Sequence, residues 1–432
     1  MRGRRTMPQK NKKRRGKLDG SASQKSGKSA SLLRRLRRPE GKMDRSLFFM
    51  ALGFIVFGVI MVFSASAPWA IREFGDPNYV LKRDIVWAII SVVAMVLVSR
   101  IPYQFYRRYA NLLYILAFIL CLLCFFPVIG VVRNGAHRWI GHDSFTIMPS
   151  DFLKIGSVMF LARLLSRQNR VNIKGLASWK NFLFIMAFIG FTILPVYLQP
   201  NFSAVIVITA SLLVLFFIGG MKVREMVPVA LLALAGALIA FWPREGNYRL
   251  DRLLIVWDPM KDPLNQGWQL MQSLFAVTTG GLFGVGFGQS RQKFDYLADE
   301  PHNDFIFAVL SEELGFVGAA LFILFYAFMI YRMIKALRAT QSRFAKLLGF
   351  GLTFIIAFQA LVNIGVSIGV VPPTGITLPF ISYGGSSLLA VSTMMGIVLN
   401  ISRDEDVTGK KRRGDPEKVE RGKLNGSQKK AA

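Results

Sequence analysis

The chain has 432 residues, of which 53% are hydrophobic, and its 54 Lys and Arg against 25 Asp and Glu give a formal net charge of +29. A mean hydropathy of +0.40 excludes a wholly disordered chain, a collagen-like chain and a small disulfide-stapled domain. Much of the charge lies in two polar tails, since residues 1–45 carry +14 and residues 401–432 carry +4. This distribution indicates a polytopic membrane protein with basic tails rather than a nucleic-acid binder.

The two ends of the chain differ from its centre. We expect residues 1–45 to form a basic, disordered cytoplasmic arm and residues 403–432 to form a charged cytoplasmic tail. The first apolar run begins near Leu47, after the arm, and is long enough to span a bilayer, so no cleavable signal peptide is expected. Residues 46–402 then form the membrane domain.

Apolar windows of about 17–25 residues predict an all-α fold with ten transmembrane helices. The expected spans are 46–66, 84–101, 110–129, 150–166, 180–199, 202–220, 225–242, 303–331, 346–370 and 377–401. Cys121 and Cys124 lie inside the third span without polar neighbours, so we interpret them as packing residues rather than a metal or redox site. No internal repeat of the kind found in transporters is visible.

The distribution of Lys and Arg supports this count. The loops expected on the side of the basic arm carry Arg100, Arg107, Arg108, Arg163, Arg167, Arg170, Lys174, Lys222, Arg224, Arg332, Lys335, Arg338, Arg343 and Lys346. The opposite loops include LQPN and VVPPTGIT, which carry no charge. Basic residues concentrate on the cytoplasmic side of membrane proteins, so both ends of the chain are predicted to be cytoplasmic.

Residues 243–302 form a large extracytoplasmic loop between the seventh and eighth spans, too long for a passive connection. Within it, WQLMQSLFAVTTGG has helical spacing with a Gly stop, and we expect it to lie along the membrane surface or re-enter it. The glycine-rich stretch 280–290 follows this helix rather than a strand, which favours a tight turn over a phosphate-binding loop.

Two stretches before and inside the fourth span carry candidate chemistry. In MPSDFLKIG, Asp151 and Lys154 are either a self-neutralising i,i+3 pair or, for Lys154, a cation placed to meet a phosphate. In NGAHRWI, Arg138 and Trp139 are either an interfacial pair or part of the same site. The three histidines, His137, His142 and His302, show no metal-ligand spacing, and no GxSxG nucleophile motif occurs.

The eighth and tenth spans begin with polar residues. Asp304 precedes FIFAVL, which is typical of a helix N-cap, although an ionisable residue at a membrane mouth is also a functional candidate. In TGITLPFISYGGSS, Pro379 and the Gly384-Gly385 pair break the start of the tenth span, and Ser386 and Ser387 supply hydroxyls. Such a break either allows close helix packing or lines a polar cavity.

These segments, in this order, resemble the SEDS family (shape, elongation, division and sporulation), the FtsW/RodA/SpoVE group of bacterial wall polymerases. The matching stretches are NGAHRWI, MPSDFLKIG, LQPN, GWQLMQSLFAVTTGGLFGVGFGQSRQKFDYL, PHNDFIFAVLSEELG and PPTGITLPFISYGGSS, which cover about residues 46–403. Residues 60–66 and the ending NISR resemble the division or sporulation branch more than the elongation branch.

The resemblance implies a peptidoglycan glycosyltransferase that polymerises lipid II at the outer face of the bacterial cytoplasmic membrane, for septal wall synthesis. It implies that Asp304 is the essential carboxylate and Lys154 the conserved lysine of the family. A carboxylate can accept the proton of an attacking sugar hydroxyl, and the undecaprenyl-pyrophosphate leaving group needs cations or a metal. Lys154, Arg138, Asp151, Ser386 and Ser387 are therefore the candidate substrate-binding residues.

The same resemblance implies the partners and the cofactor. The expected partners are lipid II and the undecaprenyl-pyrophosphate glycan, a class B penicillin-binding protein that crosslinks the strands, and other division-complex membrane proteins, with no nucleic acid. A divalent cation, Mg²⁺ or Mn²⁺, is expected near Asp304, and no organic cofactor is expected.

Three positions depart from the family pattern. Asp151 stands where the family usually has Glu, Asn201 where it usually has Asp, and Met148 where it usually has Gln. Asp151 keeps the charge on a shorter side chain, whereas Asn201 loses it, which puts an acid, base or metal-ligand role for Asn201 in doubt.

Two other functions compete with polymerisation. A flippase that moves a lipid-linked precursor would also use polar residues in a bundle of spans, but it would need a polar path through the inner halves, which are apolar here. A division-complex scaffold would act through its tails, which support only electrostatic contact with anionic lipids or acidic partners.

Overall fold

The structure is a computed structural model. The residues it describes are 43–133, 136–142, 145–167, 178–221, 227–228, 231, 254–261, 266–295 and 302–413. The expected disordered arm lies almost wholly outside these residues, as do residues 414–432 of the tail and the seventh predicted span.

The described part is mostly helical. Its longer elements are α2 (Arg45–Phe74), α3 (Tyr79–Arg100), α4 (Tyr103–Leu123), β1 (Gly130–Arg133), β2 (Ala136–His142), β3 (Phe145–Ile147), α5 (Pro149–Arg167), α6 (Ser178–Leu198), α7 (Phe202–Ile218), α10 (Gln266–Thr279), α12 (Ile306–Ala339), α13 (Arg343–Ser367) and α14 (Gly385–Arg413). Two short helices, η2 (Pro259–Lys261) and α11 (Gln292–Asp295), lie in the large loop.

Nine of the ten predicted spans overlap described helices. The remaining one, the seventh span at 225–242, falls outside the described residues except for isolated positions. Five described helices are long and apolar enough to cross a membrane: α2, α4, α12, α13 and the part of α14 up to Arg403. The chain is therefore a multi-pass membrane protein, while the count of ten spans stays a prediction.

Local sequence explains where helices begin and end. Asp44 caps α2, because its Oδ1 accepts a hydrogen bond from the Leu47 amide at 3.2 Å, and Gly75 ends the helix in the left-handed conformation at φ 69°. Ser342 caps α13 in the same way, accepting from the Ala345 amide at 3.3 Å.

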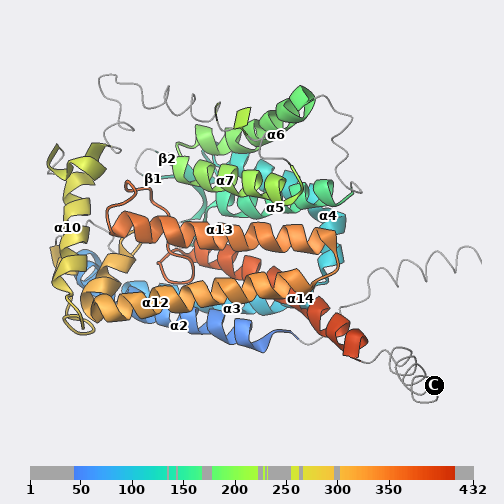
Figure 1. The fold of residues 1–432 in the computed structure, drawn as a ribbon. Helices are drawn as coiled ribbons and strands as arrows, with labels where there is room; N and C mark the ends of the chain where they lie inside the picture. Colours follow the sequence, from blue (N-terminus) through green and yellow to red (C-terminus); the bar gives the residue numbers. More distant parts are fainter. Residues whose placement is uncertain are drawn as a thin grey trace, which may run out of the picture.

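The helices form one bundle with a distinct end (Figure 1). Helices α2, α3, α12, α13 and α14 run side by side, and α4, α5, α6 and α7 pack beside them. Helix α10 lies across the end of the bundle opposite to the end where α14 reaches Arg413. This confirms the helix expected within the large loop.

Small residues allow these helices to approach closely. A methyl group on Gly396 of α14 would lie 2.7 Å from the Met95 carbonyl oxygen of α3, and one on Gly156 of α5 would lie 3.2 Å from the Tyr114 Cα of α4. Since lipid supplies no hydrophobic force between helices, such contacts contribute much of their association.

A small antiparallel sheet corrects the all-α prediction. It has the order β1-β2-β3, with Val131 opposite Trp139 and Ile140 opposite Ile147. The third predicted span was extended too far, since α4 ends at Leu123 and β1 begins at Gly130. The Asn134-Gly135 dipeptide in the sequence is a hairpin signal that the apolar window concealed.

Two breaks interrupt the helical structure of the bundle. Helix α12 contains Gly315 at φ 70°, ψ −175°, far from helical values. Helix α14 begins at Gly385 rather than at residue 377, because residues 368–384 are not helical, which confirms the predicted break.

The glycine-rich stretch 280–290 forms the tight turn that the sequence predicts. Gly281, Gly284, Gly286 and Gly288 all have positive φ.

Candidate active site

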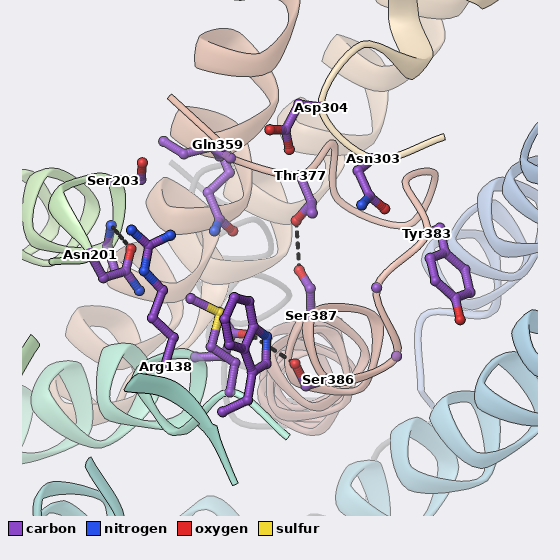
Figure 2. Close-up of a pocket in the computed structure, with 18 of the residues that line it drawn as sticks. Arg138, Asn201, Ser203, Asn303, Asp304, Gln359, Thr377, Tyr383, Ser386 and Ser387 are labelled. Atoms are coloured by element: carbon purple, nitrogen blue, oxygen red, sulfur yellow. Dashed lines mark hydrogen bonds between the residues drawn. The ribbon is translucent and has the colours of Figure 1, made fainter. Parts of the chain in front are cut away.

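One cavity of about 350 Å³ is lined by all six predicted site residues. Figure 2 shows four of them, Arg138, Asp304, Ser386 and Ser387, around this space. Its walls come from α3, β2, β3, α5, α7, the turn before α12, α13, the non-helical segment before α14 and the first residues of α14. The lining residues used below are Arg83, Trp87, Arg138, Asp151, Lys154, Asn201, Asn303, Asp304, Gln359, Thr377, Tyr383, Ser386 and Ser387.

Asp151 and Lys154 form a buried ion pair at the start of α5. Lys154 Nζ donates to Asp151 Oδ1 at 2.7 Å, and each residue is 5% exposed. The second carboxylate oxygen of Asp151 accepts a hydrogen bond from Ser386 Oγ at 3.3 Å. The i,i+3 pairing is thus confirmed, and it places a neutralised cation on the cavity wall.

Asn201 has a structural task at the start of α7. Its Oδ1 accepts from the Ala204 amide at 3.2 Å, which caps the helix, and its Nδ2 donates to Ser150 Oγ at 3.3 Å. The side chain is 3% exposed and links α7 to α5. An amide does both tasks without a charge, which accounts for the residue that departs from the family pattern.

Arg138 is held in place from β2. Its Nε donates to the Gln199 carbonyl at 3.3 Å, and Nη2 donates to the Pro200 carbonyl. These carbonyls belong to the turn between α6 and α7. The guanidinium is therefore fixed at the cavity edge, where its charge faces the space enclosed by the other lining residues.

Asp304 lies in the turn before α12, half-buried on the cavity wall. The prediction that it caps the helix is wrong, because Phe305 occupies the N-cap position and makes no side-chain cap. The helix therefore begins at Ile306, one residue later than an N-cap at Asp304 would place it. Instead, Asn363 Nδ2 donates to the Asp304 carbonyl at 2.9 Å and to the Ile376 carbonyl at 2.8 Å, which ties this turn to α13 and to the segment before α14.

His302 anchors the same turn. It is 1% exposed, its ring lies 5.2 Å from those of Trp69 and Tyr383, and its carbonyl accepts from the Tyr383 amide at 3.0 Å. Burial lowers the pKa of this imidazole to about 3, so the ring is neutral at physiological pH. His302 therefore packs rather than titrates.

The broken start of α14 supplies hydroxyls. Thr377 Oγ1 and Ser387 Oγ share a hydrogen bond at 2.8 Å, and Ser382 Oγ accepts from the Leu378 amide at 2.7 Å. Gly385 is required here, because a methyl group in its place would overlap the Trp87 indole. Non-helical backbone at this depth thus lines a cavity and is satisfied by side chains.

Sequence reasoning missed several lining residues, among them Arg83 and Trp87 of α3, Asn303, and Gln359 of α13. Arg83 and Gln359 had a usable signal, since each is a polar residue in or beside an apolar run. With Arg138 and Lys154, Arg83 gives the cavity three cations against the two carboxylates Asp151 and Asp304, which favours an anionic ligand.

Within the residues whose side chains are described, no three His, Cys, Asp or Glu side chains gather to hold a metal ion. Both oxygens of Asp151 already have partners, so Asp304 is the carboxylate that could contact an ion in the cavity. Mg²⁺ commonly takes one or two carboxylates and completes its shell with substrate phosphates and water. The donor set fits an ion that arrives with a pyrophosphate.

Comparison with known proteins identifies the family. The family model described as "Cell cycle protein" (FtsW/RodA/SpoVE) matches residues 44–407. The chain belongs to this family. It is 39% identical over 363 residues to stage V sporulation protein E of Bacillus subtilis (strain 168), covering 83% of this chain and 97% of that protein.

Other FtsW/RodA/SpoVE relatives agree. A probable peptidoglycan glycosyltransferase FtsW of Geobacter sp. (strain M18) is 35% identical over 368 residues, covering 85% of this chain and 98% of that protein. A solved chain described under structural coordination of polymerization and crosslinking by a peptidoglycan synthase complex matches with a TM-score of 0.68 and 27% identity, covering 84% and 98% of the two chains. RodA of Thermus thermophilus, at 24% identity and a TM-score of 0.60 over 84% and 97%, shows the shared fold.

Proposed function

We propose that this FtsW/RodA/SpoVE chain is a peptidoglycan glycosyltransferase that polymerises lipid II into glycan strands at the outer face of the cytoplasmic membrane. The main observation behind the proposal is that Asp304 lines the same cavity as the cations Arg83, Arg138 and Lys154. The names of the relatives, which include several probable peptidoglycan glycosyltransferases, support the same reaction.

The chemistry fits the residues. The acceptor hydroxyl of lipid II attacks the anomeric carbon of the growing strand, so a new C–O bond forms while the bond to the pyrophosphate breaks. Asp304 accepts the hydroxyl proton as the bond forms. The leaving pyrophosphate carries its electron pair away as a stable anion, so its departure needs positive charge rather than a strong acid.

Lys154 and Arg138 are held on the cavity wall by different kinds of contact. Lys154 is already paired with Asp151, so it contributes a polarised ion pair rather than a free positive charge. Arg138 is oriented by the Gln199 and Pro200 carbonyls, which hold its guanidinium at the cavity edge. We assign the main contact with the pyrophosphate to Arg138 and Arg83, with Ser386 and Ser387 binding sugar or phosphate oxygens.

A divalent ion would be held by Asp304 and by the pyrophosphate. When bound, it would supply Lewis-acid stabilisation of the leaving group. Asp304 lies on the same wall as Thr377, whose hydroxyl is bonded to Ser387, so the protein offers neutral oxygens beside the carboxylate.

The finer topology and the partner belong to the same proposal. We place both termini in the cytoplasm, since Arg332, Lys335, Arg338 and Arg343 lie where α12 meets α13, at the bundle end opposite to α10. We further propose a septal location and a class B penicillin-binding protein as the crosslinking partner. The likeness to a chain of a peptidoglycan synthase complex supports the partner.

The test is polymerisation of labelled lipid II by the purified full chain with its cognate transpeptidase. Asp304→Ala should abolish polymerisation without changing the yield of folded protein. Asp76→Ala is the matched control, since Asp76 is an aspartate outside the cavity that pairs with Lys82 at 2.8 Å. Undiminished polymerisation by Asp304→Ala would refute the base, and scrambling of lipid II across vesicles without polymer would favour a flippase.

A further inference from the structure

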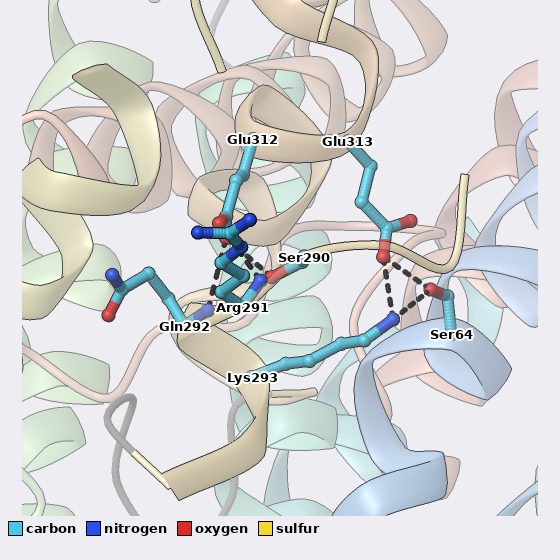
Figure 3. A network of polar contacts seen from close by, with 7 residues as sticks. All are labelled: Ser64, Ser290, Arg291, Gln292, Lys293, Glu312 and Glu313. Carbon is cyan, nitrogen blue, oxygen red and sulfur yellow. Dashed lines mark hydrogen bonds and ion pairs between the residues drawn. The ribbon is translucent and has the colours of Figure 1, made fainter. Parts of the chain in front are cut away.

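A second buried polar network lies outside the cavity, at residues 312 and 313 of the helix that follows Asp304 (Figure 3). Lys293 Nζ and Glu313 Oε1 form an ion pair at 2.8 Å, and Ser64 of α2 joins both, donating to Glu313 Oε1 at 2.6 Å and accepting from Lys293 at 3.0 Å. Each of the three is at most 5% exposed. The network joins the large loop, α12 and α2.

The neighbouring carboxylate, Glu312, forms hydrogen bonds with the same part of the loop. It is 1% exposed and accepts hydrogen bonds from the Arg291 amide at 3.0 Å, from the Gln292 amide at 3.4 Å and from Ser290 Oγ. Loop residues 290–293 are thus held by two adjacent glutamates. Burying a carboxylate is costly unless it is paired and hydrogen-bonded, so these contacts stabilise the attachment of the loop to α12.

The backbone of α12 is joined to the loop as well. At the break marked by Gly315, the Glu312 and Glu313 carbonyls accept from the Val285 and Gly286 amides at 3.0 and 3.2 Å. Beyond the break, the Phe316 and Val317 amides donate to the Gly281 and Leu282 carbonyls at 2.8 and 3.0 Å. The glycine-rich stretch therefore supplies hydrogen bonds that the helix loses at the break.

Glycine is required where the loop enters the break. A methyl group on Gly284 would overlap the Glu313 backbone, and one on Gly315 would overlap the Gly284 backbone. A methyl group on Gly280 would likewise overlap the Ser311 carbonyl oxygen. The loop and the first part of α12 are therefore in direct backbone contact and form one packed unit.

This unit reaches Asp304. The first part of α12, residues 306–314, is a rod about 13 Å long at the helical rise, with Asp304 just before one end and the glutamates at the other. At that end of the rod, Asn363 Nδ2 donates to the Asp304 carbonyl at 2.9 Å, and the His302 carbonyl accepts from the Tyr383 amide at 3.0 Å.

We propose that Glu312 and Glu313 are positioning residues that set the location of Asp304 by locking the glycine-rich loop to the first part of α12. They do not line the cavity, and they act on the reaction through Asp304. The proposal rests on the proposed role of Asp304 as the base. A displacement of about 1 Å remote from the reacting atoms can lower a rate a hundredfold, so loosening this lock should appear in kcat.

The first test is kinetic. In the full chain with its transpeptidase, Glu313→Gln and Lys293→Met should each lower kcat for lipid II polymerisation about tenfold or more, with KM changed less than twofold. Ser290→Ala, which removes one neutral donor to Glu312, should lower kcat two- to threefold. Arg332→Gln is the matched control, since it breaks the Arg332–Asp44 pair of 2.9 Å far from the loop, and kcat should stay unchanged.

The second test does not depend on catalysis. Asp304→Cys in a Cys121→Ala, Cys124→Ala background should be alkylated by a charged, membrane-impermeant thiol reagent at a defined rate. Adding Glu313→Gln should change that rate at least fivefold, whereas adding Arg332→Gln should not. Labelling therefore reports the position of residue 304 even if Asp304→Ala still polymerises lipid II and the assignment of the base fails.

The outcomes separate positioning from stability. Normal kcat per folded molecule together with unchanged labelling would overturn the proposal. So would a lower melting temperature for Glu313→Gln with normal kcat and labelling, because the network would then serve stability alone. If Glu313→Gln fails to fold, Ser290→Ala takes its place in both tests. Unchanged kcat and unchanged labelling in that variant would equally overturn the positioning proposal.

Discussion

Lys154 Nζ and Asp151 Oδ1 lie 2.7 Å apart across one turn of α5, and each residue is 5% exposed. The pair faces the cavity, and Ser386 donates to the other oxygen of the carboxylate. The sequence left two interpretations of Lys154, as a member of a structural ion pair or as a cation that faces the substrate. In the structure Lys154 is paired with Asp151 and also lines the cavity. The ion pair with Asp151 fixes the position of the Lys154 ammonium on the cavity wall.

Breaking this pair from one side should be costly. Asp151→Asn leaves a buried ammonium without its counter-ion, and we expect a loss of about 3–5 kcal/mol in unfolding free energy. The double variant Asp151→Leu, Lys154→Met should recover most of that stability, because two apolar side chains replace two charges, but it should not polymerise lipid II. Thermal unfolding in detergent and the polymerisation assay measure the two effects. An active double variant would contradict a role of the pair in substrate binding.

Asn201 should matter mainly through its helix cap. Asn201→Ala removes the acceptor for the Ala204 amide and should cost about 1 kcal/mol, whereas Asn201→Asp keeps the acceptor and loses only the donor to Ser150. Ser342→Ala, which removes the cap of α13, is the control. We expect Asn201→Ala and Ser342→Ala to lower thermal stability by similar amounts. A much larger loss for Asn201→Ala would show that the cap is not its main contribution.

Arg83 was not foreseen from the sequence and should bind the anionic substrate. We expect Arg83→Ala to raise KM for lipid II about tenfold, equivalent to roughly 1.4 kcal/mol of lost binding free energy. Lys82→Ala changes the adjacent cation, which is exposed and pairs with Asp76 rather than lining the cavity, and it should leave KM unchanged. Equal effects of the two substitutions would indicate a general surface field instead of a specific contact.

Sequence patterns predicted the parts of this molecule that depend on local composition. Apolar windows located nine described helices, and spacing placed Asp151 beside Lys154. The sheet β1-β2-β3 was missed because its strands are short and follow an apolar run that reads as helix. Asp304 was misassigned as a cap because the helix begins one residue later, with Phe305 at the N-cap position. The six candidate residues were found one motif at a time, and only the fold shows that they share one cavity.

The buried imidazole of His302 should make the protein less stable in acid. Its pKa is lowered from 6.5 to about 3 in the folded protein, so between these values the unfolded chain takes up a proton that the folded chain refuses. Stability from this residue is therefore present above pH 6.5 and is lost as the pH falls, by roughly 2 kcal/mol between pH 6.5 and 5. His302→Asn should flatten the dependence of unfolding on pH in this range. An unchanged slope would show that His302 is accessible to protons.

Removal of divalent ions should separate activity from stability. Among the described side chains no three potential ligands gather, so we expect an ion to bind between Asp304 and the substrate pyrophosphate rather than in the free protein. A chelator should then lower polymerisation at least tenfold, with recovery on adding Mg²⁺ or Mn²⁺, while the melting temperature without lipid II stays unchanged. Asp304→Asn should lose the response to the ion as well as the activity. A chelator that lowers the melting temperature of the substrate-free protein would instead show an ion held by the protein alone, and the assignment of Asp304 as its contact would be wrong.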